Sequence, residues 1–304
     1  MDGIINVYKE AGFTSHDVVA KLRGICRQKK IGHTGTLDPQ ATGVLPVCLG
    51  SATRACEMLT DRTKEYVAEL LLGKITDTQD TTGTVLEERE VAVDEAQVRE
   101  VIESFVGGYD QIPPMYSALK VNGKKLYELA RAGKEVERQA RHVDLPAIEI
   151  LEIRLPMVKF RVECSKGTYI RSLCADIGGK LGCGGTMQSL VRTRVGEFRL
   201  TDALTLTQLQ ELRDMDRLEE ALLPTDRIFA DFNAVHVEEK WRKLIDNGNA
   251  FYPGQTMEQT TYPVGEWVRV YREDDSFVGI YAYDGAKEWY KPVKIFPSNT
   301  ESRK

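Results

Sequence analysis

The sequence has few of the residues that build metal centres and disulfide frameworks. Six cysteines and four histidines occur among 304 residues. No two cysteines have the C-x-x-C spacing, and the histidines at positions 16, 33, 142 and 236 do not cluster. These spacings argue against a structural zinc site and predict reduced, partly buried thiols. We therefore expect the protein to need no metal and no cofactor.

Long apolar runs are also missing. No stretch approaches the roughly 18–20 consecutive apolar residues that a membrane-spanning helix needs. The first five residues lack a basic region followed by an apolar core, so the sequence shows no signal peptide. We expect a cytoplasmic protein without membrane contact. With 304 residues, 42% of them hydrophobic and 29% charged, the chain is predicted to form about two globular domains.

The acidic net charge of −5 argues against a globally basic nucleic-acid binder, but the charges are unevenly spread. Residues 154–200 carry nine Lys or Arg against three Asp or Glu, a net charge of +6. Acidic side chains are concentrated in residues 85–103 and 202–231. A basic face on an acidic protein is typical of a specific RNA binder.

One segment, Gly32–Gly50, is dominated by residues that restrict or free the backbone. It holds four glycines and two prolines, which predict a loop and exclude one regular element across it. A single carboxylate, Asp38, lies in the middle, directly before Pro39. The proline ring disfavours the helical region for Asp38 and favours an extended conformation. Composition alone leaves two interpretations open, a structural turn with a solvated acid and a stiff loop that presents a functional carboxylate.

The letters GHTGTLDPQATGVLP in this segment resemble the catalytic loop of the TruB family of tRNA pseudouridine synthases. The resemblance implies that Asp38 is the essential catalytic residue. It also implies a reaction in which the N1–C1′ bond of uridine breaks, the base turns while bound, and C5 bonds to C1′. A carboxylate that acts as nucleophile or base in a water-poor pocket needs a nearby cation, because burial alone would protonate it.

Further motifs of this family follow in order across residues 1 to about 200. In Gly167–Leu173, with the sequence GTYIRSL, the resemblance assigns Arg171 to pair with Asp38 and Tyr169 to the pocket. The letters KEY match a K-x-Y motif, so that Tyr66 would stack on the target base and help to move the C5 proton. Without the motif, Arg171 would be interpreted as a surface side chain and Tyr66 as a strand residue in the core.

The target uridine must be flipped out of a stacked RNA. The resemblance assigns His33 to the vacated space, Asp80 to the flipped nucleotides and Leu190 to the wall of the base pocket. Their structural alternatives are a loop histidine, a loop acid and a core leucine. Residues 113–127 match a segment that leads into an insertion closing over the RNA, which we place at 117–145. The side chains predicted to contact the RNA backbone, without reading bases, are Lys64, Lys120, Lys124, Lys125 and Arg131.

Hydrophobic periodicity predicts an alternation of strands and helices. Strands are expected at residues 4–8, 43–49, 65–72, 147–153 and 157–164, with a strand-rich stretch at 187–200. Helices are expected from an N-cap at Ser15, from a capping box at Asp94, from Ile170 and over about 205–223. In the last segment, the spacing of Val237, Trp241 and Leu244 predicts a helix, and strands are expected at 266–272, 277–283 and 288–295.

Together these patterns and the resemblance imply a mixed α/β (α+β) protein. Residues 1–230 would form the pseudouridine synthase fold, with a mainly antiparallel central sheet flanked by helices and a cleft across it. Residues 231–304 would form a small β-rich domain, which resembles a PUA-like RNA-binding module in position and pattern.

By resemblance, the protein isomerises the uridine at position 55 in the T-loop of tRNA. It is expected to bind the T-arm as a monomer, without an obligate protein partner. Three alternatives remain: a guide-RNA-dependent synthase subunit, a tRNA-folding chaperone, and a glycosidase using Asp38 with a second acid. For the glycosidase, Asp77 and Asp80 are weak candidates because they lie in a separate loop. The main interpretation requires Asp38 and Arg171, 133 positions apart, to form an ion pair with Tyr66 beside them.

Overall fold

The computed structural model describes residues 1–121 and 123–297, and its larger part is built around one eight-stranded sheet. The strand order is β1-β3-β13-β4-β12-β11, with β2 beside β3 and β14 beside β13. The strands are β1 (Gly3–Lys9), β2 (Ile31–His33), β3 (Thr42–Leu49), β4 (Lys64–Leu72), β11 (Ala147–Arg154), β12 (Met157–Cys164), β13 (Gly185–Val195) and β14 (Phe198–Arg199). Only β3 and β13 pair in parallel within this sheet, so the predicted mixed fold with a mainly antiparallel sheet is confirmed.

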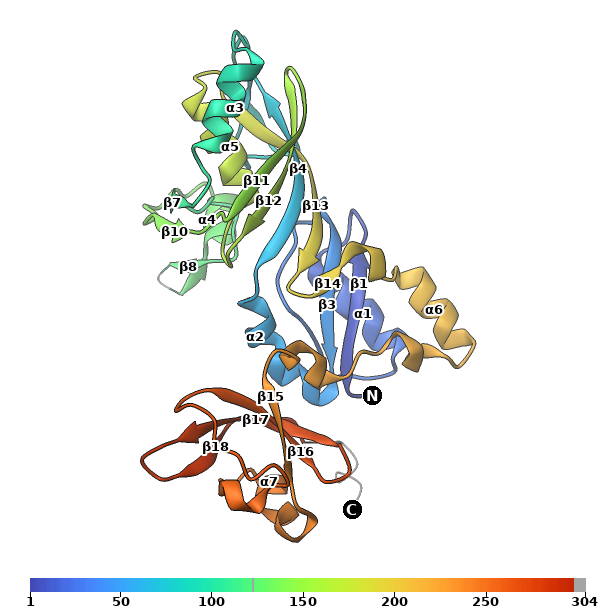
Figure 1. Cartoon of the computed structure of the whole chain (residues 1–304). Coiled ribbons are helices and arrows are strands. Elements are labelled where there is room, and N and C mark those ends of the chain that lie inside the picture. The colour runs from blue at the N-terminus through green and yellow to red at the C-terminus, as the bar shows by residue number, and fades with distance from the viewer. Residues whose placement is uncertain (122, 298–304) are drawn as a thin grey trace.

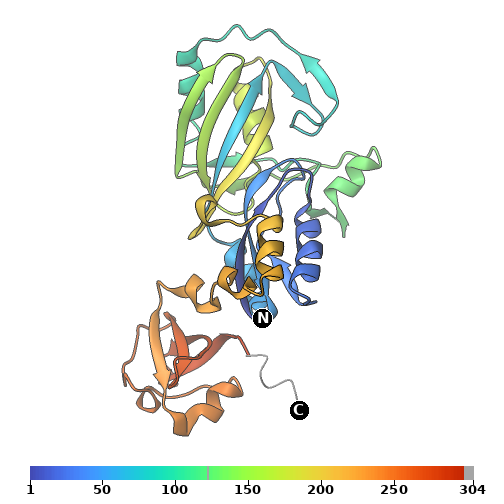
Figure 2. The same ribbon diagram turned by 90° about the vertical axis from the view of Figure 1, so that its right-hand side faces the viewer.

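Helices cover the sheet in two groups. In Figure 2, α1 (Ser15–Ile25) and α6 (Leu206–Asp214) lie side by side, and their apolar residues share a core with β1 and β3. In Figure 1, α3 (Glu95–Glu103) and α5 (Ile170–Lys180) lie next to each other; α3 packs beside β11, and α5 packs against β13 and β4. Their apolar residues form a second core with the strands around β4.

Strand β12, which contributes to this second core, alternates between buried and partly exposed residues as predicted. Val158, Phe160 and Val162 of β12 are fully buried, whereas Lys159 and Arg161 between them are partly exposed. Successive side chains of a strand point to opposite faces, so one face of β12 packs against the helices and the other meets solvent. The capping box predicted at Asp94 is also present and starts α3.

The segment predicted to close over RNA contains short elements. Within it lie the hairpin strands β8 (Lys120–Val121) and β9 (Lys124–Lys125), followed by α4 (Leu126–Arg131). At its end β10 (Arg141–Val143) pairs with β7 (Tyr109–Gln111). Elsewhere, α2 (Cys56–Thr60) precedes β4, and β5 (Lys74–Thr76) pairs with β6 (Val85–Glu88). The closure of 117–145 over RNA stays a prediction.

The end of the described chain forms a second, four-stranded sheet, at the bottom of Figure 1. Its elements are β15 (Asn233–Val237), α7 (Arg242–Asp246), β16 (Trp267–Arg272), β17 (Phe277–Asp284) and β18 (Trp289–Ile295). Ile280 and Phe296 from this part pack with Phe198 and Phe229 in a core shared with the larger sheet. The predicted β-rich C-terminal region is therefore confirmed, while the boundary at residues 230 and 231 stays a prediction.

Three expectations about local structure need correction. The N-cap of α1 is Thr14, and Ser15 is the first helical residue. Val237 belongs to strand β15, so the helix predicted from it shrinks to the five residues of α7, because β15 pairs in parallel with β16. The helix predicted over 205–223 ends at Asp214, and only a short 3₁₀ turn follows.

None of the helices among the described residues has the length and apolar character needed to span a membrane.

Candidate active site

The loop that carries Asp38 connects β2 to β3, and neighbouring segments hold it by hydrogen bonds. The backbone N–H of Leu37 donates to Ser15 Oγ over 3.0 Å. The carbonyl of Pro39 accepts from the N–H of Gly12 over 2.9 Å and from Lys9 Nζ over 3.0 Å. The stiffness expected from the prolines is therefore reinforced on both sides of Asp38 by contacts with β1 and α1.

Two buried cations support this loop, and the sequence analysis missed both. Lys9 is fully buried, and burial lowers the pKa of its amine to about 8, although the charge of Asp38 acts in the opposite direction. Arg192 is 1% exposed and donates from Nε to the carbonyl of Val44 over 2.6 Å and from Nη2 to that of Gly35 over 3.3 Å. Strand alternation could have identified Lys9, because Ile5 and Val7 precede it on the same face.

Asp38 forms an ion pair with Arg171, as the sequence predicts. Arg171 Nε lies 2.8 Å from Asp38 Oδ2, and Nη2 donates to Oδ1 over 3.3 Å. The Arg171 side chain is 5% exposed and that of Asp38 is 37% exposed. The guanidinium is thus buried behind the carboxylate, which itself remains accessible from solvent. Two contacts of this kind fix the orientation of the carboxylate as well as compensating its charge.

Arg171 also joins two further segments to Asp38. Its Nη1 donates to the carbonyl of Thr78 over 2.9 Å, and its Nη2 to the carbonyl of Tyr116 over 2.8 Å. Arg171 lies in the first turn of α5, so one side chain connects α5, the β5–β6 loop, the start of the insertion and the Asp38 loop. A planar guanidinium suits such a junction because its donors point in fixed directions.

Asp80 lies near the same guanidinium. Its Oδ2 is 3.9 Å from Arg171 Nε, and its Oδ1 accepts hydrogen bonds from Thr78 Oγ1 and the N–H of Thr82. Asp80 lies in the β5–β6 loop, separate from the loop of Asp38 as expected. The fold nevertheless brings both acids to one arginine, so a second carboxylate does lie in the site.

Tyr66 and Leu190 lie on adjacent strands of the central sheet. Tyr66 of β4 is paired in register with Arg192 of β13, and Leu190 is paired with Ala68. Both side chains are 7% exposed and belong to the same core as Leu37. Burial raises the pKa of the Tyr66 hydroxyl, while the charge of Arg192 opposes the shift. The phenol therefore carries its proton at neutral pH.

Tyr169 is the N-cap residue of α5, and its backbone is held by a side chain that we did not predict. Gln111 accepts a hydrogen bond from the N–H of Tyr169 over 2.8 Å and donates to its carbonyl over 3.0 Å. Gln111 also donates to the hydroxyl of Tyr109 over 2.6 Å, and that hydroxyl donates to Asp176 over 2.8 Å. This buried chain fixes the start of the helix that carries Arg171. No sequence pattern marks Gln111.

The predicted RNA-backbone contacts divide into one buried and four more accessible cations. Lys64 is 7% exposed, and its ammonium donates to the carbonyls of Thr60 and Arg62 over 2.8 and 2.7 Å. In this structure the ammonium is turned inward, and burial lowers its pKa to about 8. The contact between Lys64 and RNA stays a prediction. Lys120, Lys124 and Arg131 are exposed and Lys125 is half-buried, all in or near β8, β9 and α4.

His33, at the end of β2, is half-buried between the Asp38 loop and α1. Its ring meets that of His16 edge to face, with 5.4 Å between the ring centroids. Burial lowers the pKa of His33, so its imidazole is neutral at pH 7. The position at one end of the loop is compatible with the predicted insertion into RNA, which stays a prediction.

Changing Ser15 should loosen the Asp38 loop. Ser15→Ala leaves the buried N–H of Leu37 without its partner, which is expected to cost about 1–3 kcal/mol in the free energy of unfolding. Thr14→Ala, the matched control, removes the helix cap and should cost about 1 kcal/mol. Urea unfolding measures both, and hydrogen exchange at Leu37 should quicken under native conditions for Ser15→Ala alone. Equal exchange in both variants would contradict this role.

Two family models match the chain. Residues 23–170 match the TruB family pseudouridylate synthase (N terminal domain), and residues 171–230 match the tRNA pseudouridylate synthase B C-terminal domain. A protein of Lachnoclostridium phytofermentans named tRNA pseudouridine synthase B is 53% identical, with 97% of this chain and 100% of that protein covered. A protein of the same name from Alkaliphilus oremlandii is 49% identical, with 97% of both chains covered.

Solved structures share the arrangement over nearly the whole chain. One is described as the structure of an H/ACA RNP bound to a substrate RNA containing 2'-deoxyuridine. It is 27% identical, covers 97% of this chain and 84% of its own, and superposes with a TM-score of 0.73. A chain from the crystal structure of a Cbf5-Nop10-Gar1 complex is 29% identical to this chain, with the same coverage and TM-score.

Proposed function

The chain belongs to the TruB family of pseudouridylate synthases, and from this membership we propose that it converts uridine to pseudouridine in the T-loop of tRNA, at position 55. The relatives named tRNA pseudouridine synthase B support a tRNA substrate. The observation that carries the proposal is the accessible carboxylate of Asp38, paired with the buried Arg171 on a loop held from both sides.

The reaction is an isomerisation that leaves the atoms of the nucleotide unchanged. The N1–C1′ bond breaks, the detached uracil turns within the site, C5 bonds to C1′, and the proton on C5 is exchanged for one on N1. Asp38 acts as the nucleophile or base for these steps. Because the base is free of covalent attachment to the ribose while it turns, the site must hold it against escape and hold the carboxylate in place.

Arg171 keeps the Asp38 carboxylate charged and oriented. A carboxylate in a pocket closed by RNA would otherwise gain a proton, since burial disfavours the charged form. The guanidinium lies within 2.8 Å of the carboxylate and is itself held by two backbone carbonyls. It therefore needs little rearrangement when the substrate excludes water. Asp80, 3.9 Å from the same guanidinium nitrogen, contacts the flipped nucleotides or positions Arg171.

The aromatic and apolar residues around the carboxylate hold the base. Tyr66 stacks on the uracil ring. Its neutral hydroxyl relays the C5 proton by accepting it on the phenol oxygen while passing its own proton to a base in the site. Tyr169 and Leu190 complete the wall of the pocket. His33 occupies the space that the flipped uridine leaves in the RNA. A neutral imidazole suits this place because it can stack between bases without binding a phosphate.

The rest of the chain binds the tRNA. We infer that residues 117–145 close over the T-arm and that Lys120, Lys124, Lys125 and Arg131 contact its phosphates, fixing the position of the RNA without reading its bases. The second sheet is proposed to be a PUA-like RNA-binding module. The enzyme is proposed to work in the cytoplasm as a monomer, without an obligate protein partner.

Two alternatives are tested alongside this proposal. The H/ACA structures raise the possibility of a guide-RNA-dependent subunit, although the relatives over 97% of the chain carry the name of a tRNA enzyme. A tRNA-folding chaperone would not need Asp38 for its action. A tRNA-folding role and a catalytic role can coexist in one protein.

The direct test is to incubate the purified protein alone with an unmodified tRNA transcript and to map pseudouridine along it. The proposal predicts one pseudouridine, in the T-loop, formed without guide RNA or protein partner. A T-arm hairpin should also be modified. Absence of product until a guide RNA is added would favour the guide-dependent alternative. Release of free uracil in proportion to enzyme turnover would favour a glycosidase.

A further inference from the structure

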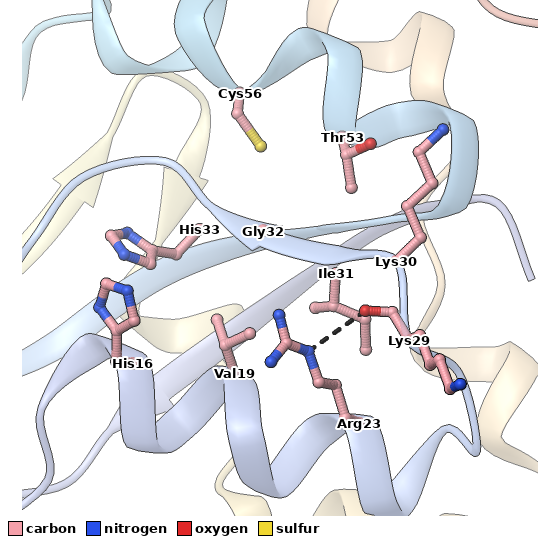
Figure 3. A pocket seen from close by; sticks show the side chains of 10 residues that line it. All are labelled: His16, Val19, Arg23, Lys29, Lys30, Ile31, Gly32, His33, Thr53 and Cys56. Atoms are coloured by element: carbon pink, nitrogen blue, oxygen red, sulfur yellow. Dashed lines mark hydrogen bonds between the residues drawn. The ribbon is translucent and has the colours of Figure 1, made fainter.

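A basic pocket opens beside the Asp38 loop, and of its lining residues only His33 has a role in the site described so far. It has a volume of about 530 Å³ and lies between α1, the chain leading into β2, and the start of α2 (Figure 3). The residues that line it are His16, Val19, Arg23, Lys29, Lys30, Ile31, Gly32, His33, Thr53 and Cys56. The size is in the range of pockets that hold small ligands or parts of larger ones.

The charge of the lining is of one sign. Arg23, Lys29 and Lys30 are exposed cations, and no Asp or Glu is among the lining residues. Within the described part of the chain, no carboxylate forms an ion pair with any of the three. Uncompensated cations around a concave surface raise the local concentration of anions and favour their binding.

Arg23 is already oriented for an anion. Its Nε donates to the carbonyl of Lys29 over 3.2 Å, so the guanidinium is fixed between α1 and β2. Figure 3 shows its two terminal nitrogens turned away from this bond, toward the space beside Val19. A guanidinium held through its Nε still offers its two terminal nitrogens as paired donors, which match the geometry of phosphate oxygens.

The pocket is continuous with the active-site loop through His33, which lines it and precedes Asp38 by five residues. If a uridine is bound at Asp38 and His33 fills the space that it left, the same RNA strand would run past His33 and therefore along the pocket that His33 lines. The next polyanion along that path is the sugar–phosphate backbone of the same strand. We propose that the pocket binds a backbone phosphate of the substrate RNA next to the flipped uridine, which rests on the proposed function.

The reactivity of the Cys56 thiol gives a way to measure whether the pocket is occupied. Of the six free cysteines it is the one that is not buried, and its thiol faces the pocket across from Arg23 (Figure 3). A hydrogen bond with Cys48 lowers the pKa of Cys56, which favours its reaction with alkylating reagents. The rate of Cys56 alkylation by iodoacetamide, followed by mass spectrometry of the intact full-length protein, therefore reports whether the pocket is filled.

Saturating tRNA transcript should slow Cys56 alkylation about tenfold or more, whereas inorganic phosphate at the same phosphate concentration should leave it nearly unchanged. An unchanged rate with saturating tRNA would overturn the proposal. Equal protection by inorganic phosphate would overturn it as well, because the pocket would then be a site for a free anion.

Variants of Arg23 give a second, independent measurement. Arg23→Ala is expected to raise the Kd for tRNA about tenfold at moderate salt and to reduce the slope of log Kd against log salt by about one, because one phosphate contact is lost. Lys21→Ala, on the same helix but outside the pocket, is the matched control and should change neither. Equal effects of both variants would show a diffuse charge effect and contradict a specific site.

The failure of this inference is distinguishable from failure of the proposed function. If the wild-type protein forms pseudouridine while Arg23→Ala binds tRNA with unchanged Kd and salt slope, only the pocket assignment is wrong. If the wild-type protein binds tRNA without forming pseudouridine, the proposed function is wrong whatever Arg23 does.

Discussion

Replacing Arg171 by alanine should lower the rate of pseudouridine formation by about 10²–10³-fold, the loss typical of removing one fixed electrostatic partner from an active site. The variant leaves Asp38 without its cation and the carbonyls of Thr78 and Tyr116 without their donor. The Asp38 carboxylate would then turn away from the substrate or gain a proton when RNA closes the site. Single-turnover kinetics with saturating tRNA measure the effect on chemistry.

A second variant separates charge from geometry. Arg171→Lys keeps a positive charge but cannot bind the carboxylate and two carbonyls at once in the directions that the guanidinium uses. We expect Arg171→Lys to react about tenfold faster than Arg171→Ala and still more slowly than the wild type. Full recovery would show that charge alone matters, and would contradict the role of Arg171 as a junction of four segments. The tRNA affinity of both variants, measured separately, controls for a general loss of binding.

Which parts of the fold the sequence predicts depends on how regular each pattern is. The alternation in β12 is unbroken, and the strand was correctly predicted. Residues 233–237 were missed as a strand because Val237, Trp241 and Leu244 also have helical spacing over a short stretch. The pairing of β15 with β16 decides the conformation, and that is a contact between distant segments.

In the active site, residues that stand in motifs were predicted, and residues that are marked only by their surroundings were missed. The contact between Asp38 and Arg171 was predicted because both stand in long, specific motifs that the fold brings together. Lys9, Gln111 and Arg192 were missed because each acts through backbone carbonyls or amides, which leave no motif in the sequence. For Lys64, the motif does not reveal whether the ammonium faces RNA or the interior, and in this structure it faces the interior.

The largest effect is expected for Asp38 itself. Asp38→Asn keeps the shape of the side chain and can still accept a hydrogen bond from Arg171, but it removes the negative charge and with it the nucleophile or base. Loss of a group that acts directly on the reacting atoms is expected to lower the rate by at least about 10³-fold. The rest of the RNA-binding surface is unchanged, so binding of tRNA should persist. Pairing with an amide leaves Asp80, 3.9 Å away, as the remaining counter-charge of the buried guanidinium, so thermal unfolding of the variant should be checked.

The measurement that tests the central claim most directly is pseudouridine mapping in an unmodified tRNA transcript, with wild-type protein beside Asp38→Asn. The transcript is incubated at protein concentrations that saturate binding, so that only chemistry differs. We predict one pseudouridine in the T-loop with the wild-type protein and none above background with Asp38→Asn, although both bind the tRNA. Pseudouridine formed by folded Asp38→Asn at a rate near that of the wild type would contradict the assignment of Asp38 as the catalytic residue.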